Sequence, residues 1–300
     1  MTETLPEINT GLFIAGARQE AADSFAVHDP ADPQTVVGFA GAASEEQARA
    51  AVAAAHDAFP AWAALDASYD LAGGDPAGPL RSGNQAWVGL AALASGRHER
   101  LLEGVIRWLR DQREEHGLVR GGPDVSWVST EHNLEARALL AGLGEDVSRL
   151  DRAIDLYLFA GDHFSQGLGD DVRPLDVQAY GIHWLLDHGR RAQAEAVEQA
   201  TDAAMFVEGR PLRGQTFSGY RPFPHGPDVL WMEGTLMMRL AKARLGSDVA
   251  ALDDSADRWA ALTAPEPPLQ ADRAAGADYH VWPAAAPAAW LTLSRVAAPG

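Results

Sequence analysis

The chain has 300 residues, of which 47% are hydrophobic, and its formal net charge at pH 7 is −18. This length suits one large domain or two, and the acidic balance disfavours nucleic-acid and anionic-membrane partners, which require a cationic surface. The sequence contains no cysteine, which excludes disulfides, thiolate nucleophiles and zinc–thiolate sites.

Neither a targeting signal nor a membrane span is expected from the apolar pattern. Residues 1–10 lack the basic start and apolar run of a secretory signal. No apolar run reaches about 18 residues, the length that a spanning helix needs. We therefore expect a cytoplasmic protein with a small-molecule substrate and no membrane partner.

The N-terminal part is predicted to contain strands followed by one helix. Short apolar runs at 12–14, 24–27 and 35–39 predict three strands, and the last two are separated by the turn-rich segment 29–33. Ser44, followed by two acids, is expected to cap a helix that runs to about residue 59.

This segment resembles the N-terminal arm of aldehyde dehydrogenases. The matching stretches are LFIAG at 12–16, DPA at 29–31, AVAAA at 51–55 and AFPAW at 58–62. The catalytic cysteine and the glycine-rich nicotinamide loop of such enzymes do not follow. The resemblance implies a structural domain at 1–65 through which copies of the chain could associate, and we expect no cofactor.

A Gly/Pro-rich connection at 66–82 is the best candidate for a domain boundary, which predicts a second domain at 66–300. The connection can be a plain linker. It can also be a loop of the site, because Asp70 lies shortly before the first polar cluster described below.

Polar clusters that precede apolar runs recur along this second part. Similar junctions begin at Asn84, near Glu131, and at Asp176, Asp228 and His280, at intervals of 47, 45, 52 and 52 residues. A repeat of this size indicates stacked supersecondary units. We expect a ring of helical hairpins whose inner helices all begin at one common mouth.

Apolar periodicity predicts the helices of these hairpins. The expected inner helices span 84–94, 129–142, 174–189, 227–245 and 283–296, and the expected outer helices span 98–115, 147–159, 191–206 and 255–262. Residues 117–128 are expected to form an extended, glycine-rich loop between two of these helices.

The pattern resembles the (α/α) toroid of the six-hairpin glycosidase superfamily over residues 68–297. The motifs that carry it are GNQAW at 83–87, STEHNL at 129–134, LDVQA at 175–179 and WMEG at 231–234. The expected fold class is therefore mainly α, a toroid of five to six helical hairpins with a small β-containing N-terminal arm.

This resemblance implies a carbohydrate-active enzyme, a glycoside hydrolase or a lyase-like relative. Glycoside cleavage uses two carboxyl groups, and Glu131 and Glu233 are the expected acid and base, with Asp176 beside them. Asp176 and Asp228 each follow a proline closely, so each can instead be a simple helix cap. The residues expected to contact substrate are Asp70, Asn84, Trp87, Asn133, Trp231, His280 and Trp282.

Other readings of the same mouth remain open. Related toroids include epimerases with histidine acid–base pairs, and here His132 and His280 could carry protons in both directions. An aromatic mouth also suits terpenoid chemistry, and the toroid can be a binding or partner subunit without catalysis. No HExxH or GxSxG motif occurs, so neither a metal site nor a serine triad is expected.

Overall fold

The computed structural model describes residues 8–21, 23–29, 32–63, 80–96, 98–264, 267–276 and 278–296. The chain divides into two compact units, Met1–Asp66 and Ala67–Gly300. This division lies one residue from the expected boundary. Asp70, expected at the site, lies outside the described residues.

The first unit contains two small sheets and one helix. Its elements are β1 (Ile8–Thr10), β2 (Leu12–Ile14), β3 (Ala17–Gln19), β4 (Asp23–Asp29), β5 (Asp32–Ala42) and α1 (Glu45–Ala63). β5 is central, parallel to β1 and antiparallel to β4, while β2 and β3 form a hairpin. Ser44 and Gln47 exchange side chain–backbone hydrogen bonds of 3.1 and 3.0 Å. This capping box fixes the start of α1.

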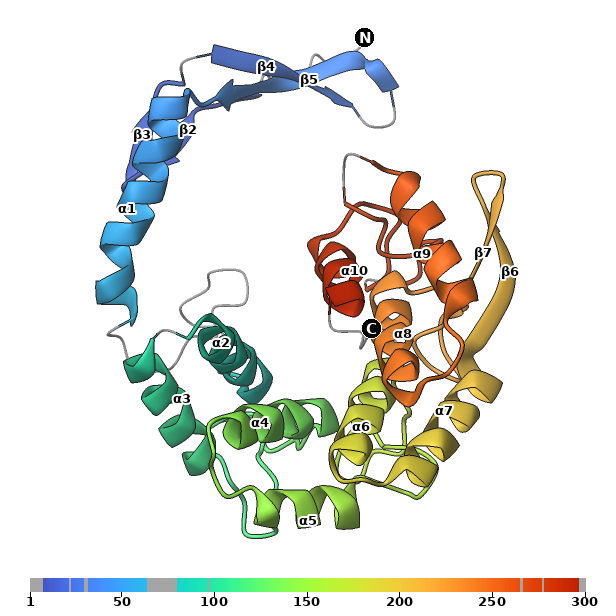
Figure 1. Ribbon diagram of the computed structural model, residues 1–300. Coiled ribbons are helices and arrows are strands. Elements are labelled where there is room, and N and C mark those ends of the chain that lie inside the picture. The colour runs from blue at the N-terminus through green and yellow to red at the C-terminus, as the bar shows by residue number, and fades with distance from the viewer. Residues whose placement is uncertain are drawn as a thin grey trace. The chain divides into compact units, whose positions relative to one another are not determined.

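The second unit is a ring of helical hairpins, and this confirms the predicted mainly α toroid (Figure 1). The inner helices are α2 (Ser82–Ser95), α4 (Thr130–Gly142), α6 (Leu175–Asp187), α8 (Met232–Leu245) and α10 (Ala285–Val296). The outer helices are α3 (Glu99–Asp111), α5 (Ser148–Tyr157), α7 (Arg191–Met205) and α9 (Ala250–Ala261).

The inner helices pack closely because small residues lie where they meet. A Cβ atom on Gly89 of α2 would lie 2.3 Å from Cδ2 of Leu139 on α4. Leu139 and Val105 of α3 are fully buried in the same cluster. A larger cluster, which includes Ile154, Ile182 and Met238, continues the core through α5, α6 and α8.

A repeated backbone bond joins the loops at the mouth, the end of the toroid at which the inner helices begin. The first N–H of α2, α4, α6 and α8 donates in each case to a carbonyl in the loop that precedes the next inner helix. The donor–acceptor pairs, with N···O distances of 2.8 to 3.0 Å, are Ser82–Gly121, Thr130–Gln166, Leu175–Pro222 and Met232–Gln270. The helix starts are therefore held in equivalent positions around the axis.

Two predictions about the elements around α8 were wrong. The helix begins at Met232 and not at Pro227, because the segment before it is extended and pairs with other loops: the N–H of Trp231 donates to the carbonyl of Tyr220 at 2.9 Å. The sequence reading also missed a hairpin of β6 (Phe206–Leu212) and β7 (Gln215–Tyr220) after α7.

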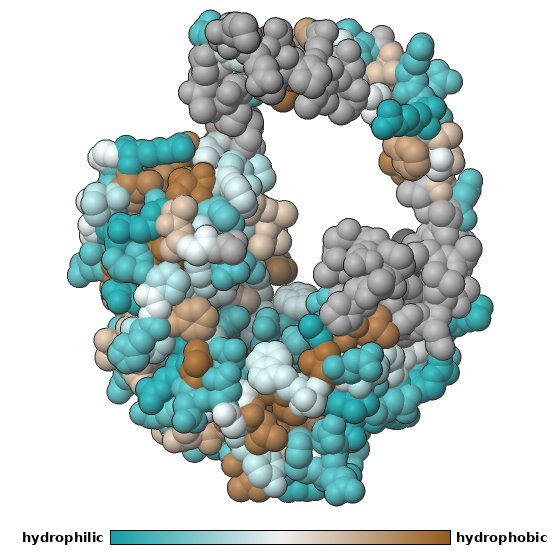
Figure 2. All heavy atoms as spheres, turned by 180° about the vertical axis from the view of Figure 1, so that it is seen from behind, coloured by the Kyte–Doolittle hydropathy of each residue, from teal (hydrophilic) through white to brown (hydrophobic). Residues whose placement is uncertain are grey.

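Smaller shifts affect two outer helices. α9 begins at Ala250, five residues before its predicted start, and α3 ends at Asp111, four residues before its predicted end. Over the face shown in Figure 2, hydrophobic side chains form small separate patches among hydrophilic ones. Among the described residues, no helix has the combined length and hydropathy to cross a membrane.

Candidate active site

Three carboxylic acids occupy equivalent positions at the mouth. Glu131, Asp176 and Glu233 are each the second residue of an inner helix, on α4, α6 and α8. The repeated backbone bond at each helix start brings the three side chains to the same end of the ring. On α2 the same position is Gly83.

Burial and mutual repulsion favour the protonated forms of these acids. Burial, followed by the charges of Asp176 and Glu233, raises the pKa of Glu131 to about 8. Burial also raises the pKa of Asp176. Burial and then Asp176 raise the pKa of Glu233, while the Trp231 side chain opposes this rise by a hydrogen bond. A site of this kind holds protonated and ionised carboxyl groups side by side near neutral pH.

Three further polar groups adjoin this cluster, and of these Glu135 was not expected there. Glu135 and Tyr180 lie one helical turn deeper than Glu131 and Asp176 on the same faces of α4 and α6. The spacing of four residues from each predicted acid is the signal that could have identified them. Tyr279 also belongs here, because burial, followed by Asp176, raises its pKa to about 12.

Buried polar side chains two residues after the acids hold the mouth loops. Asn133 donates to the carbonyls of Val119 (2.9 Å) and Ser129 (2.7 Å) and accepts from the N–H of Val119 (2.7 Å). Gln178 and Thr235 make the corresponding bonds on α6 and α8. Asn133 was predicted to contact substrate, but these bonds give it a structural role and we leave it out of the proposed site.

The two predicted histidines have different surroundings. The His132 ring packs against Gly83, where a Cβ atom would lie 2.4 Å from its Cδ2, and it meets Trp127 edge-on at 6.0 Å. His280 lies in the loop before α10 and stacks on Trp282 at 3.8 Å between ring centroids. Each imidazole thus packs on its own tryptophan.

Tryptophan side chains are exposed near the starts of the inner helices. Trp87 and Trp127 are each 41% exposed and Trp282 is 54% exposed. Trp231 meets Tyr279 edge-on at 6.2 Å, beside Glu233. Exposed aromatic faces of this kind can stack on a ligand.

Two further polar residues singled out from the sequence are exposed to solvent. Asn84 is exposed on the first turn of α2. Asp228 is also exposed and lies 2.6 Å from Arg210, outside the acid cluster. Within the described ranges, no group of three or more His, Asp or Glu side chains is arranged to hold a metal ion.

Comparisons with known proteins support the fold. No protein-family model matches the chain, and no curated protein matches its sequence. A D-mannose isomerase structure matches with 12% identity and a TM-score of 0.54, over 84% of this chain and 81% of that one. The structure of PssZ from Listeria monocytogenes matches with 11% identity and a TM-score of 0.54, over 73% and 74% of the two chains. These likenesses agree with the (α/α) toroid fold of the second unit.

Proposed function

We propose that the toroid is a carbohydrate-active enzyme that cleaves glycosidic bonds with carboxyl groups at its mouth. The observation that carries this proposal is the meeting of Glu131, Asp176 and Glu233, from three consecutive inner helices, in surroundings that raise the pKa of each. Glycoside hydrolysis requires a protonated and an ionised carboxyl group on either side of the scissile bond.

The surroundings of each acid support a division of roles. Glu131, with its pKa raised to about 8, carries a proton at neutral pH and acts as the general acid. We assign Glu233 as the base. Burial and then Asp176 raise its pKa too, but a hydrogen bond from Trp231 opposes this rise, and no group opposes the rise at Glu131. Asp176 raises the pKa of both neighbours and so keeps a proton at the mouth.

The proposed reaction is a hydrolysis in which both carboxyl groups return to their starting protonation states. Glu131 gives its proton to the glycosidic oxygen as the bond from that oxygen to the anomeric carbon breaks. A water molecule forms the new bond to that carbon and gives its proton to the Glu233 carboxylate. Transfer of a proton from Glu233 back to Glu131 through solvent restores the starting state.

The other features of the mouth suit a neutral sugar. The exposed faces of Trp87, Trp127 and Trp282 can stack on pyranose rings. The clustered acids and the net charge of −18 disfavour an anionic substrate. We therefore place neutral oligosaccharides first among the substrates to test.

The reaction class can be tested with a panel of neutral oligosaccharides and aldoses. We expect the protein to generate new reducing ends, and we expect Glu131→Gln to form them about 10²–10⁴-fold more slowly. Aldose–ketose interconversion that disappears in His132→Asn would instead establish the isomerase alternative. An unsaturated product that absorbs ultraviolet light would indicate elimination and a lyase.

A further inference from the structure

A cavity lies inside the ring, one helical turn and more beyond the acids of the mouth. Its volume is about 250 Å³. Residues of α2, α4, α6 and α8 line it, among them Trp87, Glu135, Ala138, Tyr180, His183 and Arg244. His183 and Arg244 follow the mouth acids of α6 and α8 by two or more turns, so this axial cavity extends towards the ends of the inner helices.

Polar groups of this cavity lack partners. Both carboxyl oxygens of Glu135 and the hydroxyl of Tyr180 are buried, and the described part of the chain gives them no hydrogen bond of good geometry. The Trp87 side chain lies close enough to Glu135 to lower its pKa, but not at the angle and distance of a well-formed bond. Glu135 as a whole is only 4% exposed. Buried polar groups are rarely left without partners, so a molecule in the cavity that offers donors and acceptors would stabilise these side chains.

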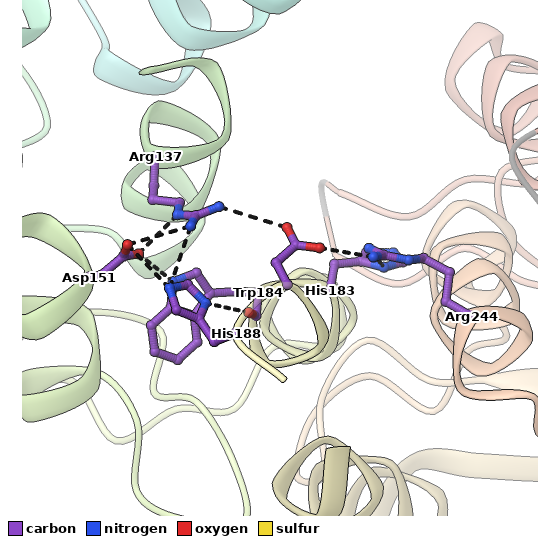
Figure 3. Close-up of polar contacts among 7 residues, drawn as sticks. Arg137, Asp151, His183, Trp184, His188 and Arg244 are labelled. Carbon is purple, nitrogen blue, oxygen red and sulfur yellow. Dashed lines mark hydrogen bonds and ion pairs between the residues drawn. The ribbon is translucent and has the colours of Figure 1, made fainter. Parts of the chain in front are cut away.

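The charged groups of the wall, in contrast, are paired with one another (Figure 3). Asp187 lies 2.9 Å from Nη2 of Arg244 and 3.7 Å from Nη1 of Arg137. Asp151 accepts hydrogen bonds from Arg137 at 2.9 Å and from the Trp184 indole at 2.8 Å. The positive charges of Arg137 and Arg244 are thus balanced by the negative charges of Asp151 and Asp187.

His183 adds a neutral donor to this wall. Its Nδ1 lies 3.0 Å from Nη1 of Arg244, which can only donate, so Nδ1 accepts and the ring proton resides on Nε2. Burial and the Arg244 charge lower the pKa of His183 to about 4, despite the opposing effect of Asp187. The imidazole is therefore uncharged at neutral pH.

We propose that the axial cavity binds a neutral polyhydroxy compound of monosaccharide size. Its volume lies just below the roughly 300–1,000 Å³ of pockets for drug-sized ligands. Trp87 and Trp184 offer aromatic surface, while Glu135, Tyr180 and His183 offer hydrogen-bonding groups without net charge. This combination recognises a ring that has an apolar face and hydroxyls at its edge.

This inference goes beyond the proposed function and does not depend on it, because it concerns binding and not turnover. Ala138 is exposed and lines the cavity, so Ala138→Leu narrows the space with a residue that favours helix. Ala192→Leu makes the same change at an exposed position of α7.

Titration calorimetry with D-glucose, D-mannose and D-xylose tests the proposal. We expect saturable binding of at least one aldose, weakened tenfold or more in Ala138→Leu and unchanged in Ala192→Leu. Tyr180→Phe, which removes one hydroxyl, is expected to weaken binding about 2- to 12-fold, the equivalent of a hydrogen bond of about 0.5–1.5 kcal/mol.

Three results would overturn the proposal. If none of the aldoses binds, the cavity holds water alone. Equal affinity in Ala138→Leu and the wild type would place the sugar outside the axial cavity. Binding of glucuronate in preference to all three aldoses would show that the wall recognises an anion.

Discussion

Glu135 lies four residues after Glu131 on α4, on the same face of the helix, and the two carboxyl groups interact. Burial, followed by the charge of Glu131, raises the pKa of Glu135 to about 9. The mouth and the axial cavity are therefore coupled electrostatically through one helix.

This coupling predicts a specific dependence of stability on pH. The pKa of Glu135 is higher in the folded protein than in the unfolded chain, where it is about 4.5, so the folded state binds the proton more tightly. The contribution of Glu135 to the free energy of unfolding is fully present below about pH 4.5 and is lost as the pH rises towards 9. Glu135→Gln removes this loss, so the variant should be more stable than the wild type at pH 8, by about 1–3 kcal/mol.

Urea unfolding at pH 5, 7 and 9 measures this difference. The advantage of Glu135→Gln should grow with pH, whereas Glu103→Gln, at an exposed position of α3, should show no such trend. If the unfolding free energies of the wild type and Glu135→Gln changed with pH in parallel, this result would contradict the buried state of Glu135.

Asp151 is predicted to show the opposite pH dependence. Burial acts to raise its pKa, but hydrogen bonds from Arg137 and Trp184 outweigh it and hold the pKa below its ordinary value. This contribution to stability is present above the unfolded-state pKa and is lost as the pH falls through the folded-state value. Asp151→Asn leaves Arg137 with only the more distant carboxylate of Asp187, so we expect a loss of up to about 3 kcal/mol at pH 7.

Thermal unfolding at several pH values separates this effect from a general loss of packing. The difference between Asp151→Asn and the wild type should shrink as the pH falls below 4. A difference that stays constant down to pH 2 would contradict the role of the ionised carboxylate.

The contact between α2 and α4 gives a prediction about packing. Gly89→Ala would place a methyl group 2.3 Å from Leu139, and overpacking of this kind costs about 1–3 kcal/mol. The double variant Gly89→Ala/Leu139→Ala should be more stable than the sum of the two single changes implies. Strict additivity in a double-mutant cycle of unfolding free energies would show that the two sites do not touch.

The first unit gives a prediction about assembly. It exposes several large hydrophobic side chains: Phe13, Phe25, Val27, Val36, Phe39 and Val52. Exposed apolar surface of this kind favours association, and we expect the full chain to form oligomers through this arm. Light scattering should give a multiple of 32.0 kDa for the full chain and a monomer after deletion of residues 1–43. A monomeric full chain would refute this expectation.

The amino-acid pattern predicted the ring and its mouth acids because both follow from local sequence. α4 begins next to its predicted start at residue 129, and Ser129 caps it by accepting a hydrogen bond from the N–H of His132 at 3.3 Å. The start of α8 was misplaced because Pro227 has the properties of a first helical residue, while bonds to distant loops keep that segment extended.

Other features depend on contacts that a sequence pattern does not contain. The β6–β7 hairpin turns at Arg213 and Gly214, both with positive φ, and this pair is not one of the common hairpin signals. Glu135 resembles a solvent-exposed helical charge, since only the assembled ring buries it. The axial cavity is formed by four helices together.

The most direct test of the central claim compares turnover and melting in Glu131→Gln and Glu233→Gln on a substrate that the wild type cleaves. If both acids transfer protons, kcat should fall by about 10²–10⁴-fold in each variant. Melting temperatures should stay equal to that of the wild type or rise, because each change removes repulsion within the acid cluster. Full activity in both variants would contradict the account and transfer the acid–base roles to His132 and His280.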